Sequence, residues 1–379
     1  MFEETVKFCD SLLQRGVPGF DLAVFVKGKC VLRHFAGFSD LENGIPMNGR
    51  ERYNIYSASK PITCAAAMQL WEKGMFSLED ELAKYMPEFG TMTVKTEDGI
   101  RPAEKPILIR HLFEMTAGFS YALRSPQLIK AREETDGCPT LEVMKYLAKE
   151  PLLFEPGDRW NYSLCHDVLA ALVEVISGVP FEDYVQANIF APLGMTSSTY
   201  LVPEEQREGL ARQYIFNAEK GKPVPHGQGC AYKFGINYAS GGAGCVSTVD
   251  DYMKFLEGLR TGKILRPETV LLMQTDRLTP HQKRTYTSAL NYGYGLGLRC
   301  PKEGGKFQNF GWGGAAGAYL TIDPTLDMSV YLGMHLLSSP VQGIRGMCYR
   351  FVRAELFGTE STDDLWKELE SVHHYHLTY

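Results

Sequence analysis

Strand-like hairpins at both ends of the chain constrain its fold more than any other feature. Near the start, the β-rich runs 22–26 and 30–36 flank a Lys-Gly-Lys turn. Near the end, the runs 318–322 and 328–335 flank the turn 323–326. Because most of the signal between the hairpins is helical, the two ends are expected to pair in one antiparallel sheet. The sequence therefore predicts an α/β fold of the α+β kind, with helices flanking the sheet and a mostly helical subdomain inserted.

Helical patterns are found before, between and after these hairpins. Apolar residues recur at helical spacing, and glycines such as Gly16 and Gly74 mark helix ends. These signals predict helices over 3–15, 61–73, 141–149, 166–176 and 341–357. The segments 90–106 and 216–240 are polar and rich in Gly, Pro and Lys, and are predicted to be loops or short hairpins. Loops of this length are often binding loops.

The order of these elements predicts a single catalytic domain over residues 1–358. Its sheet part would comprise about 1–62 and 244–358, and its helical part about 63–243. The charged, His-rich residues 359–379 are expected to be a C-terminal tail, with metal binding there the less favoured interpretation.

Composition excludes several partners. The 379 residues carry a net charge of −6 without a basic cluster, which argues against nucleic acid. No stretch approaches the roughly 20 apolar residues that cross a bilayer, so we expect no membrane partner. The acidic start lacks the pattern of a secretory signal. The nine cysteines run from Cys9 to Cys348 without a C-x-x-C pair, which favours reduced thiols and a cytoplasmic location.

The tetrapeptide Ser57-Ala58-Ser59-Lys60 is the first candidate for chemistry. It opens a predicted helix, where Ser57 and Lys60 share a face. A serine hydroxyl is a weak nucleophile until a neighbouring base takes its proton, and an amine can be that base. The positive end of the helix would stabilise an oxyanion formed there. The motif occurs about once by chance in such a chain, so it needs support from its context.

Two further elements supply that context. The segment 155–163 forms a Pro-Gly turn leading to Tyr162 just before a predicted helix. The glycine-rich strand 310–315 lies directly before the C-terminal hairpin, where Gly313 and Gly314 would let a substrate approach the backbone.

Together these motifs resemble the serine β-lactamase and penicillin-binding-protein-like superfamily. The chain looks like a member of the class C β-lactamase-like branch and is closest in motifs to its family VIII carboxylesterases. The resemblance covers nearly the whole chain and includes the segments 53–56, 112–119, 154–163, 192–195, 241–251 and 294–297. It implies a β-lactamase/transpeptidase-like fold and a serine hydrolase that forms an acyl-enzyme.

The resemblance also implies roles for individual residues. Ser57 would be the acylated nucleophile, Lys60 its proton partner, and Tyr162 a phenol that relays protons to and from the leaving group. The backbone N–H groups of Ser57 and Ala315 would form the oxyanion hole. The expected substrate-binding residues are Leu164, Trp312, Gly313 and Gly314.

Two departures from the β-lactamase pattern favour an esterase. Leu164 stands where β-lactamases have the Asn of Y-x-N, and Trp312 stands where they have the Lys of K-T-G. A charge-assisted hydrogen bond contributes roughly 1.5–3 kcal/mol. Its loss should weaken the binding of anionic β-lactams at least tenfold. A carboxylesterase acting on small acyl esters is therefore the leading prediction, with neutral Lys60 as the base and Tyr162 as proton shuttle.

Other interpretations stay open. An acyltransferase, a D-amino-acid amidase or peptidase, and a weak β-lactamase belong to the same branch, and a catalytically silent binding protein would keep only the fold. A small-molecule ester or amide is the expected partner, and no cofactor or metal is expected because no metal-ligand spacing occurs. We interpret His166 as structural and regard Tyr121, Tyr238 and Tyr292 as candidates for lining the cleft.

Overall fold

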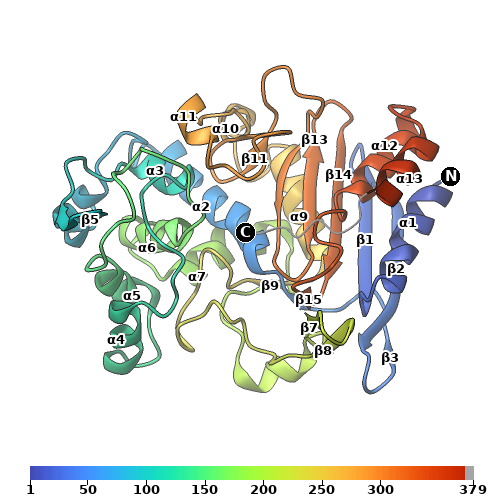
Figure 1. Cartoon of the computed structure of the whole chain (residues 1–379), viewed down its shortest axis with the longest axis horizontal. Helices are drawn as coiled ribbons and strands as arrows, with labels where there is room; N and C mark the ends of the chain where they lie inside the picture. The colour runs from blue at the N-terminus through green and yellow to red at the C-terminus, as the bar shows by residue number, and fades with distance from the viewer. Residues whose placement is uncertain (372–379) are drawn as a thin grey trace.

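The two ends of the chain meet in one antiparallel sheet. A computed structural model describes residues 1–371, with the backbone alone at 204, 205 and 208. In it, β1 (Gly19–Val26) lies between β2 (Lys29–Asp40) and β14 (Met328–Met334) and runs antiparallel to both (Figure 1). The β1–β14 pair joins the two chain ends, with Leu22 opposite Leu332. The predicted sheet is confirmed.

Both faces are buried at the centre of this sheet. Within the described residues it has eight strands in the order β10-β11-β12-β13-β14-β1-β2-β3. Along β1, Leu22 and Val24 enter one hydrophobic core and Ala23 enters the other, as the two-residue period of a strand requires. The remaining strands are β3 (Ile45–Pro46), β10 (Gly293–Tyr294), β11 (Arg299–Cys300), β12 (Phe310–Gly313) and β13 (Tyr319–Asp323).

Helices from the two chain ends cover one face. They are α1 (Glu3–Gln14), α12 (Met347–Phe357) and α13 (Thr362–Ser371), grouped beside β1 and β14 in Figure 1. Phe8 of α1 stacks on Phe351 of α12, with ring centroids 5.2 Å apart. The helix predicted over 341–357 begins only at Met347, because residues 341–346 form turns.

The chain end differs from expectation. Within the expected tail 359–379, residues 362–371 form α13, which buries Leu365 and Leu369 in the core shared with α1 and α12. These leucines lie one helical turn apart and form an apolar stripe. The tail prediction therefore does not hold for α13, and residues 372–379, with their histidines, lie outside the described residues.

Helix α9 (Val249–Arg260) covers the opposite face, where Tyr252 stacks on Tyr331 of β14 with centroids 4.5 Å apart. The helical part lies beyond it (Figure 1). Its helices are α2 (Lys60–Glu72), α3 (Ile109–Phe113), α4 (Pro126–Glu134), α5 (Thr140–Leu147), α6 (Cys165–Ser177), α7 (Phe181–Val185) and α8 (Ala191–Leu193), followed after α9 by α10 (Pro267–Met273) and α11 (Pro280–Lys283). Helix α2 is buried along nearly its whole length and packs against α6.

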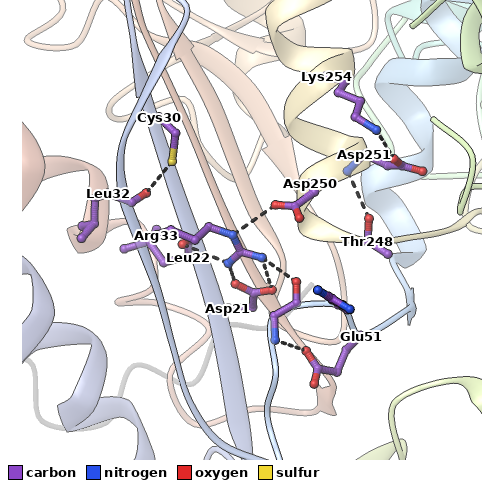
Figure 2. A network of polar contacts seen from close by, with 12 residues as sticks. Asp21, Leu22, Cys30, Leu32, Arg33, Glu51, Thr248, Asp250, Asp251 and Lys254 are labelled. Atoms are coloured by element: carbon purple, nitrogen blue, oxygen red, sulfur yellow. Dashed lines mark hydrogen bonds and ion pairs between the residues drawn. The ribbon is translucent and has the colours of Figure 1, made fainter. Parts of the chain in front are cut away.

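A polar network ties the sheet to α9 and to the segment before β4 (Tyr53–Asn54). Figure 2 shows Arg33 of β2 between Asp21 of β1 and Asp250 of α9. Asp21 is fully buried, and Arg33 also donates to the carbonyl of Gly49 at 2.8 Å. Burying a carboxylate is costly unless it is paired, so Arg33 is the group that makes Asp21 tolerable inside the sheet.

The two predicted loop regions contain short hairpins. They are β5 (Thr93–Thr96) with β6 (Gly99–Pro102), and β7 (Tyr214–Asn217) with β8 (Lys222–Pro225); β15 (Leu336–Leu337) pairs in parallel with β7, and β9 (Val246–Ser247) pairs with β4. All nine cysteines lie within the described residues and each is a free thiol. Among the described helices, none has the length and apolar character needed to span a bilayer. The domain limits proposed from the sequence stay a prediction.

Candidate active site

Ser57 lies in a short 3-10 turn, η1 (Tyr56–Ser59), between β4 and α2. The preceding residue, Tyr56, has a φ of 49°, in the left-handed region that non-glycine residues seldom adopt. Tyr56 is fully buried and its hydroxyl donates to Gln213 Oε1, which fixes the turn. Strained backbone of this kind is concentrated at functional sites, and here it leaves Ser57 partly exposed at the start of α2.

The three side chains proposed to carry the chemistry lie in contact. The Tyr162 hydroxyl donates to Ser57 Oγ at 2.5 Å, and Lys60 Nζ donates to the same oxygen at 3.5 Å. Tyr162 precedes α6, whose packing against α2 brings the phenol over the serine. Proton transfer requires groups within hydrogen-bond reach. The phenol meets this requirement, and the amine lies at its outer limit.

Lys60 is fully buried at the first position of α2. Its Nζ donates to the carbonyl of Gly242 at 2.7 Å. The same Nζ lies 4.6 Å from the ring centroid of Tyr162 and 5.7 Å from that of Tyr121. A backbone carbonyl and two aromatic rings thus hold the amine beneath Ser57.

Trp312 of β12 forms an aromatic wall beside the phenol. Its ring is stacked on Tyr162, with 14° between the ring planes and 6.2 Å between the centroids. Tyr294 meets Trp312 edge to face at 5.4 Å, and Trp160 lies 6.2 Å from Tyr162. Trp312 is partly exposed, so it can contact a substrate as expected.

The structure shows why positions 313 and 314 are glycines. A Cβ atom at Gly314 would lie 2.3 Å from the carbonyl oxygen of Ile55, and one at Gly313 would lie 2.5 Å from Arg345 Nη2. The protein's own atoms therefore leave no room for a side chain at either position, and contact of these glycines with substrate stays a prediction. The close approach places the turn that contains Ala315 beside the turn that contains Ser57, as an oxyanion hole made of their two N–H groups needs.

Leu164 is a correction to the predicted substrate-binding set. It is only 1% exposed and belongs to the main hydrophobic core, because it immediately precedes α6 and continues its buried face. A side chain buried in this way packs the helix and does not reach a substrate. We therefore remove Leu164 from the proposed site.

Of the other residues considered from the sequence, one tyrosine lies at the site and the rest pack elsewhere. Tyr121 lies against Tyr162, with ring centroids 5.3 Å apart, whereas Tyr238 is fully buried and does not line a cleft. Tyr292 stacks on Phe307 and donates to Asn309 Oδ1, so these contacts are with the segment that precedes β12. His166 is fully buried, and burial lowers its pKa to about 3, in line with the structural role we expected.

Asp167 and Gly242 are polar groups of the site that the sequence analysis missed. Gly242 supplies the carbonyl that receives Lys60, and Asp167 lies buried beside it on α6. One signal was available for Asp167, since it is the acidic residue in the first turn of a mostly apolar helix. Nothing in the local sequence singles out the carbonyl of Gly242.

The loop between β8 and β9 also bounds a cavity of about 360 Å³. Its lining includes Asn54, Gln228, Cys230, Lys233 and Phe234. Within residues 1–371, no group of three or more His, Cys, Asp or Glu side chains is arranged to hold a metal ion.

Comparison with known proteins identifies the family. The family model described as Beta-lactamase matches residues 2–343. The chain belongs to the beta-lactamase family. It is 30% identical to Rv1367c of Mycobacterium tuberculosis over 354 residues, covering 86% of this chain and 87% of that protein. It is 29% identical to the esterase EstB of Burkholderia gladioli over 367 residues, covering 89% of this chain and 90% of EstB.

A solved structure agrees with the fold. EstCE1, described as a hydrolase with promiscuous acyltransferase activity, superposes with a TM-score of 0.78 at 26% identity, covering 94% of this chain and 98% of that one. The β-lactamase-like fold expected from the sequence is confirmed, and the chain is a serine hydrolase of this family.

Proposed function

We propose that the protein is a carboxylesterase that cleaves small acyl esters through an acyl-enzyme on Ser57. The contact between Ser57, Lys60 and Tyr162 carries this proposal, because it joins a hydroxyl, an amine and a phenol at one point. The similarity to the esterase EstB and to the hydrolase EstCE1 supports the reaction class.

In the acylation step, Ser57 Oγ attacks the ester carbonyl while its proton passes through Tyr162 to the neutral amine of Lys60. The N–H groups of Ser57 and Ala315 would stabilise the oxyanion of the tetrahedral intermediate. Collapse of the intermediate breaks the bond to the alcohol oxygen, which takes the proton back through Tyr162. A water molecule then attacks the acyl-enzyme by the reverse route and releases the carboxylic acid.

The walls of the site favour a neutral ester. Trp312 offers an aromatic face where β-lactamases have the lysine of their third motif. The guanidinium of Arg345 is nearby, but its Nη1 already donates to the carbonyl of Gly314 and to Gln342 Oε1, both at 2.7 Å. A small ester with an apolar acyl group fits this arrangement better than an anionic β-lactam.

Acyl transfer is the second candidate function. EstCE1 is described as having promiscuous acyltransferase activity, and its fold covers nearly the whole of this chain. Chemically, transfer differs from hydrolysis only in the group that attacks the acyl-enzyme. We also propose a cytoplasmic location, which the free thiols of all nine cysteines support.

A substrate panel tests the proposed function. Wild type and Ser57→Ala are assayed with p-nitrophenyl acetate and butyrate, a D-amino-acid amide and nitrocefin, with and without added alcohols and amines. We expect ester turnover in wild type alone, with poor turnover of nitrocefin and no effect of EDTA. Efficient nitrocefin hydrolysis would contradict the role given to Trp312, and transfer products in excess of acid would favour the acyltransferase.

A further inference from the structure

Asp167 is a buried carboxylate next to the proposed catalytic amine. It lies on the first turn of α6, close to Tyr162, and is 1% exposed. Burying a carboxylate costs free energy unless hydrogen bonds or an opposite charge compensate. The contacts of Asp167 therefore identify the groups that compensate its burial.

The two carboxylate oxygens have different surroundings. Oδ1 accepts hydrogen bonds from the Tyr238 hydroxyl at 2.9 Å and from the Ser240 hydroxyl at 2.6 Å. Oδ2 is buried, has no side-chain hydrogen-bond partner among the described residues, and faces the backbone N–H of Gly242, which helps to lower the pKa of the carboxyl group. One oxygen thus anchors the segment before β9, and the other faces Gly242.

Gly242 lies close to both Asp167 Oδ2 and Lys60 Nζ. A Cβ atom at position 242 would lie 2.5 Å from Asp167 Oδ2 and 3.3 Å from Lys60 Nζ, so both charged groups are within 3.3 Å of one point. The carbonyl of Gly242 accepts the hydrogen bond from Lys60 Nζ at 2.7 Å. Only a residue without a side chain leaves the space for this approach.

We propose that Asp167 is a positioning residue that holds the Lys60 amine beneath Ser57 and sets the pH at which this amine can accept the Ser57 proton. It acts in two ways. Through Tyr238 and Ser240 it fixes the segment that presents the Gly242 carbonyl, and through its negative charge it stabilises the ammonium form of Lys60. This inference rests on the proposed esterase mechanism and deepens it.

Charge balance around the carboxylate supports this role. The titratable groups that surround Asp167 are Lys60 from α2, Cys165 and His166 from α6, and Tyr121, Tyr200, Cys230 and Tyr238 from neighbouring segments. Burial raises the pKa of each of these phenols and thiols, and it lowers the pKa of His166 to about 3, so all of them are neutral at pH 7. Within this group, Lys60 is the residue whose positive charge can compensate the negative charge of Asp167.

The pKa of the Asp167 carboxyl group depends on the same neighbours. Burial raises the pKa of Asp167, whereas the hydroxyl of Ser240, the positive charge of Lys60 and the hydroxyl of Tyr238 lower it. Replacing the carboxylate by an amide of the same shape would remove the charge and keep an oxygen for both hydroxyls. Asp167→Asn is therefore the informative substitution.

The test is the pH dependence of kcat/KM for p-nitrophenyl butyrate in wild type and Asp167→Asn. Without the nearby anion the amine should lose its proton at lower pH, so the midpoint of the acidic limb should move down by about one pH unit or more. The plateau should fall about tenfold, because a less basic amine takes the proton less readily. A lower plateau with an unmoved limb would show a merely structural role and overturn the proposal.

Tyr238→Phe is the second variant, and it decides the question if Asp167→Asn does not fold. It removes one of the two hydroxyls that stabilise the carboxylate, so the carboxyl group of Asp167 should take up its proton at higher pH. The negative charge beside Lys60 is then partly lost, and the acidic limb should move in the same direction as in Asp167→Asn by a smaller amount. An unmoved limb in a folded Tyr238→Phe protein would count against the proposal.

The rate at which a fluorophosphonate labels Ser57 is measured over the same pH range. If wild type turns over no ester but the pH dependence of Ser57 labelling shifts in Asp167→Asn, the esterase proposal is refuted and the role of Asp167 stands. If wild type turns over esters but the pH profiles of both labelling and turnover are unshifted in Asp167→Asn, the role of Asp167 is refuted and the esterase proposal stands.

Discussion

The Tyr162 hydroxyl lies 2.5 Å from Ser57 Oγ, although 105 positions of the chain separate the two residues. The contact forms because α2 and α6 pack together, with Ser57 just before one helix and Tyr162 just before the other. Lys60 completes the group from beneath. The phenol and the amine therefore both approach Ser57 Oγ from elements that are fixed by the packing of two helices.

Removal of the phenol should leave the nucleophile in place but slow its reaction. Tyr162→Phe keeps the ring that stacks on Trp312 and loses only the hydroxyl that contacts Ser57. A positioned proton donor contributes about 10²- to 10⁴-fold, so we expect kcat for p-nitrophenyl butyrate to fall at least about a hundredfold. Tyr292→Phe, which changes a tyrosine outside the site, is the control and should leave kcat near the wild-type value. A Tyr162→Phe enzyme of normal activity would remove the phenol from the mechanism.

Lys60→Arg tests whether a neutral amine is the base. A guanidinium keeps its proton at every practical pH, so it cannot accept the proton of Ser57. We expect the rate to fall about a hundredfold or more and the acidic limb of the pH–rate profile to disappear. Circular dichroism would establish that the variant is folded. A profile with the same acidic limb as wild type would mean that another group produces it.

The buried pair in the sheet makes a prediction about stability. Arg33→Met would leave Asp21 fully buried without its counter-charge, and breaking such a pair costs about 3–5 kcal/mol. Urea denaturation should show this loss in the free energy of unfolding. Lys145→Met, which breaks an exposed pair with Glu142, should have little effect. Equal stability of the two variants would show that Arg33 does not compensate the charge of Asp21.

Two buried histidines predict how stability depends on pH. Burial lowers the pKa of His111 and of His166 to about 3 each, whereas an unfolded histidine takes up a proton near pH 6.5. Below about pH 6.5 the unfolded chain binds more protons than the folded chain, so stability should fall as the pH falls, by about 1 kcal/mol per pH unit for each histidine. His166→Asn should show a smaller drop in Tm from about pH 7 to about pH 5 than wild type. The exposed His281→Asn is the control, and the same drop in all three proteins would contradict the assignment.

Much of the fold follows from local pattern. The uninterrupted apolar run Leu22-Ala23-Val24 is typical of a strand buried on both faces, and the structure places these residues in two separate cores. The S-x-x-K motif and Tyr162 are also visible in the sequence, but the motif alone would be weak. It became informative through the order of the other motifs along the chain.

The remainder depends on atoms that are distant in sequence. The sequence shows that position 314 has no side chain. It does not show the reason, because the carbonyl of Ile55 that leaves no room for one belongs to a distant segment. Leu164 falls within the second motif, yet its burial depends on how α6 packs. The relation of Asp167 to Lys60 likewise exists only where two helices meet, so no local pattern predicts it.

Ser57 as the acylated residue is the central claim, and a covalent probe tests it most directly. Folded wild type is treated with a fluorophosphonate, digested, and the peptides are analysed by mass spectrometry, with Ser57→Ala as the control. We expect one adduct on Ser57 in wild type and none in the variant, in step with the loss of ester turnover. An adduct on another residue, or full turnover by Ser57→Ala, would contradict the assignment.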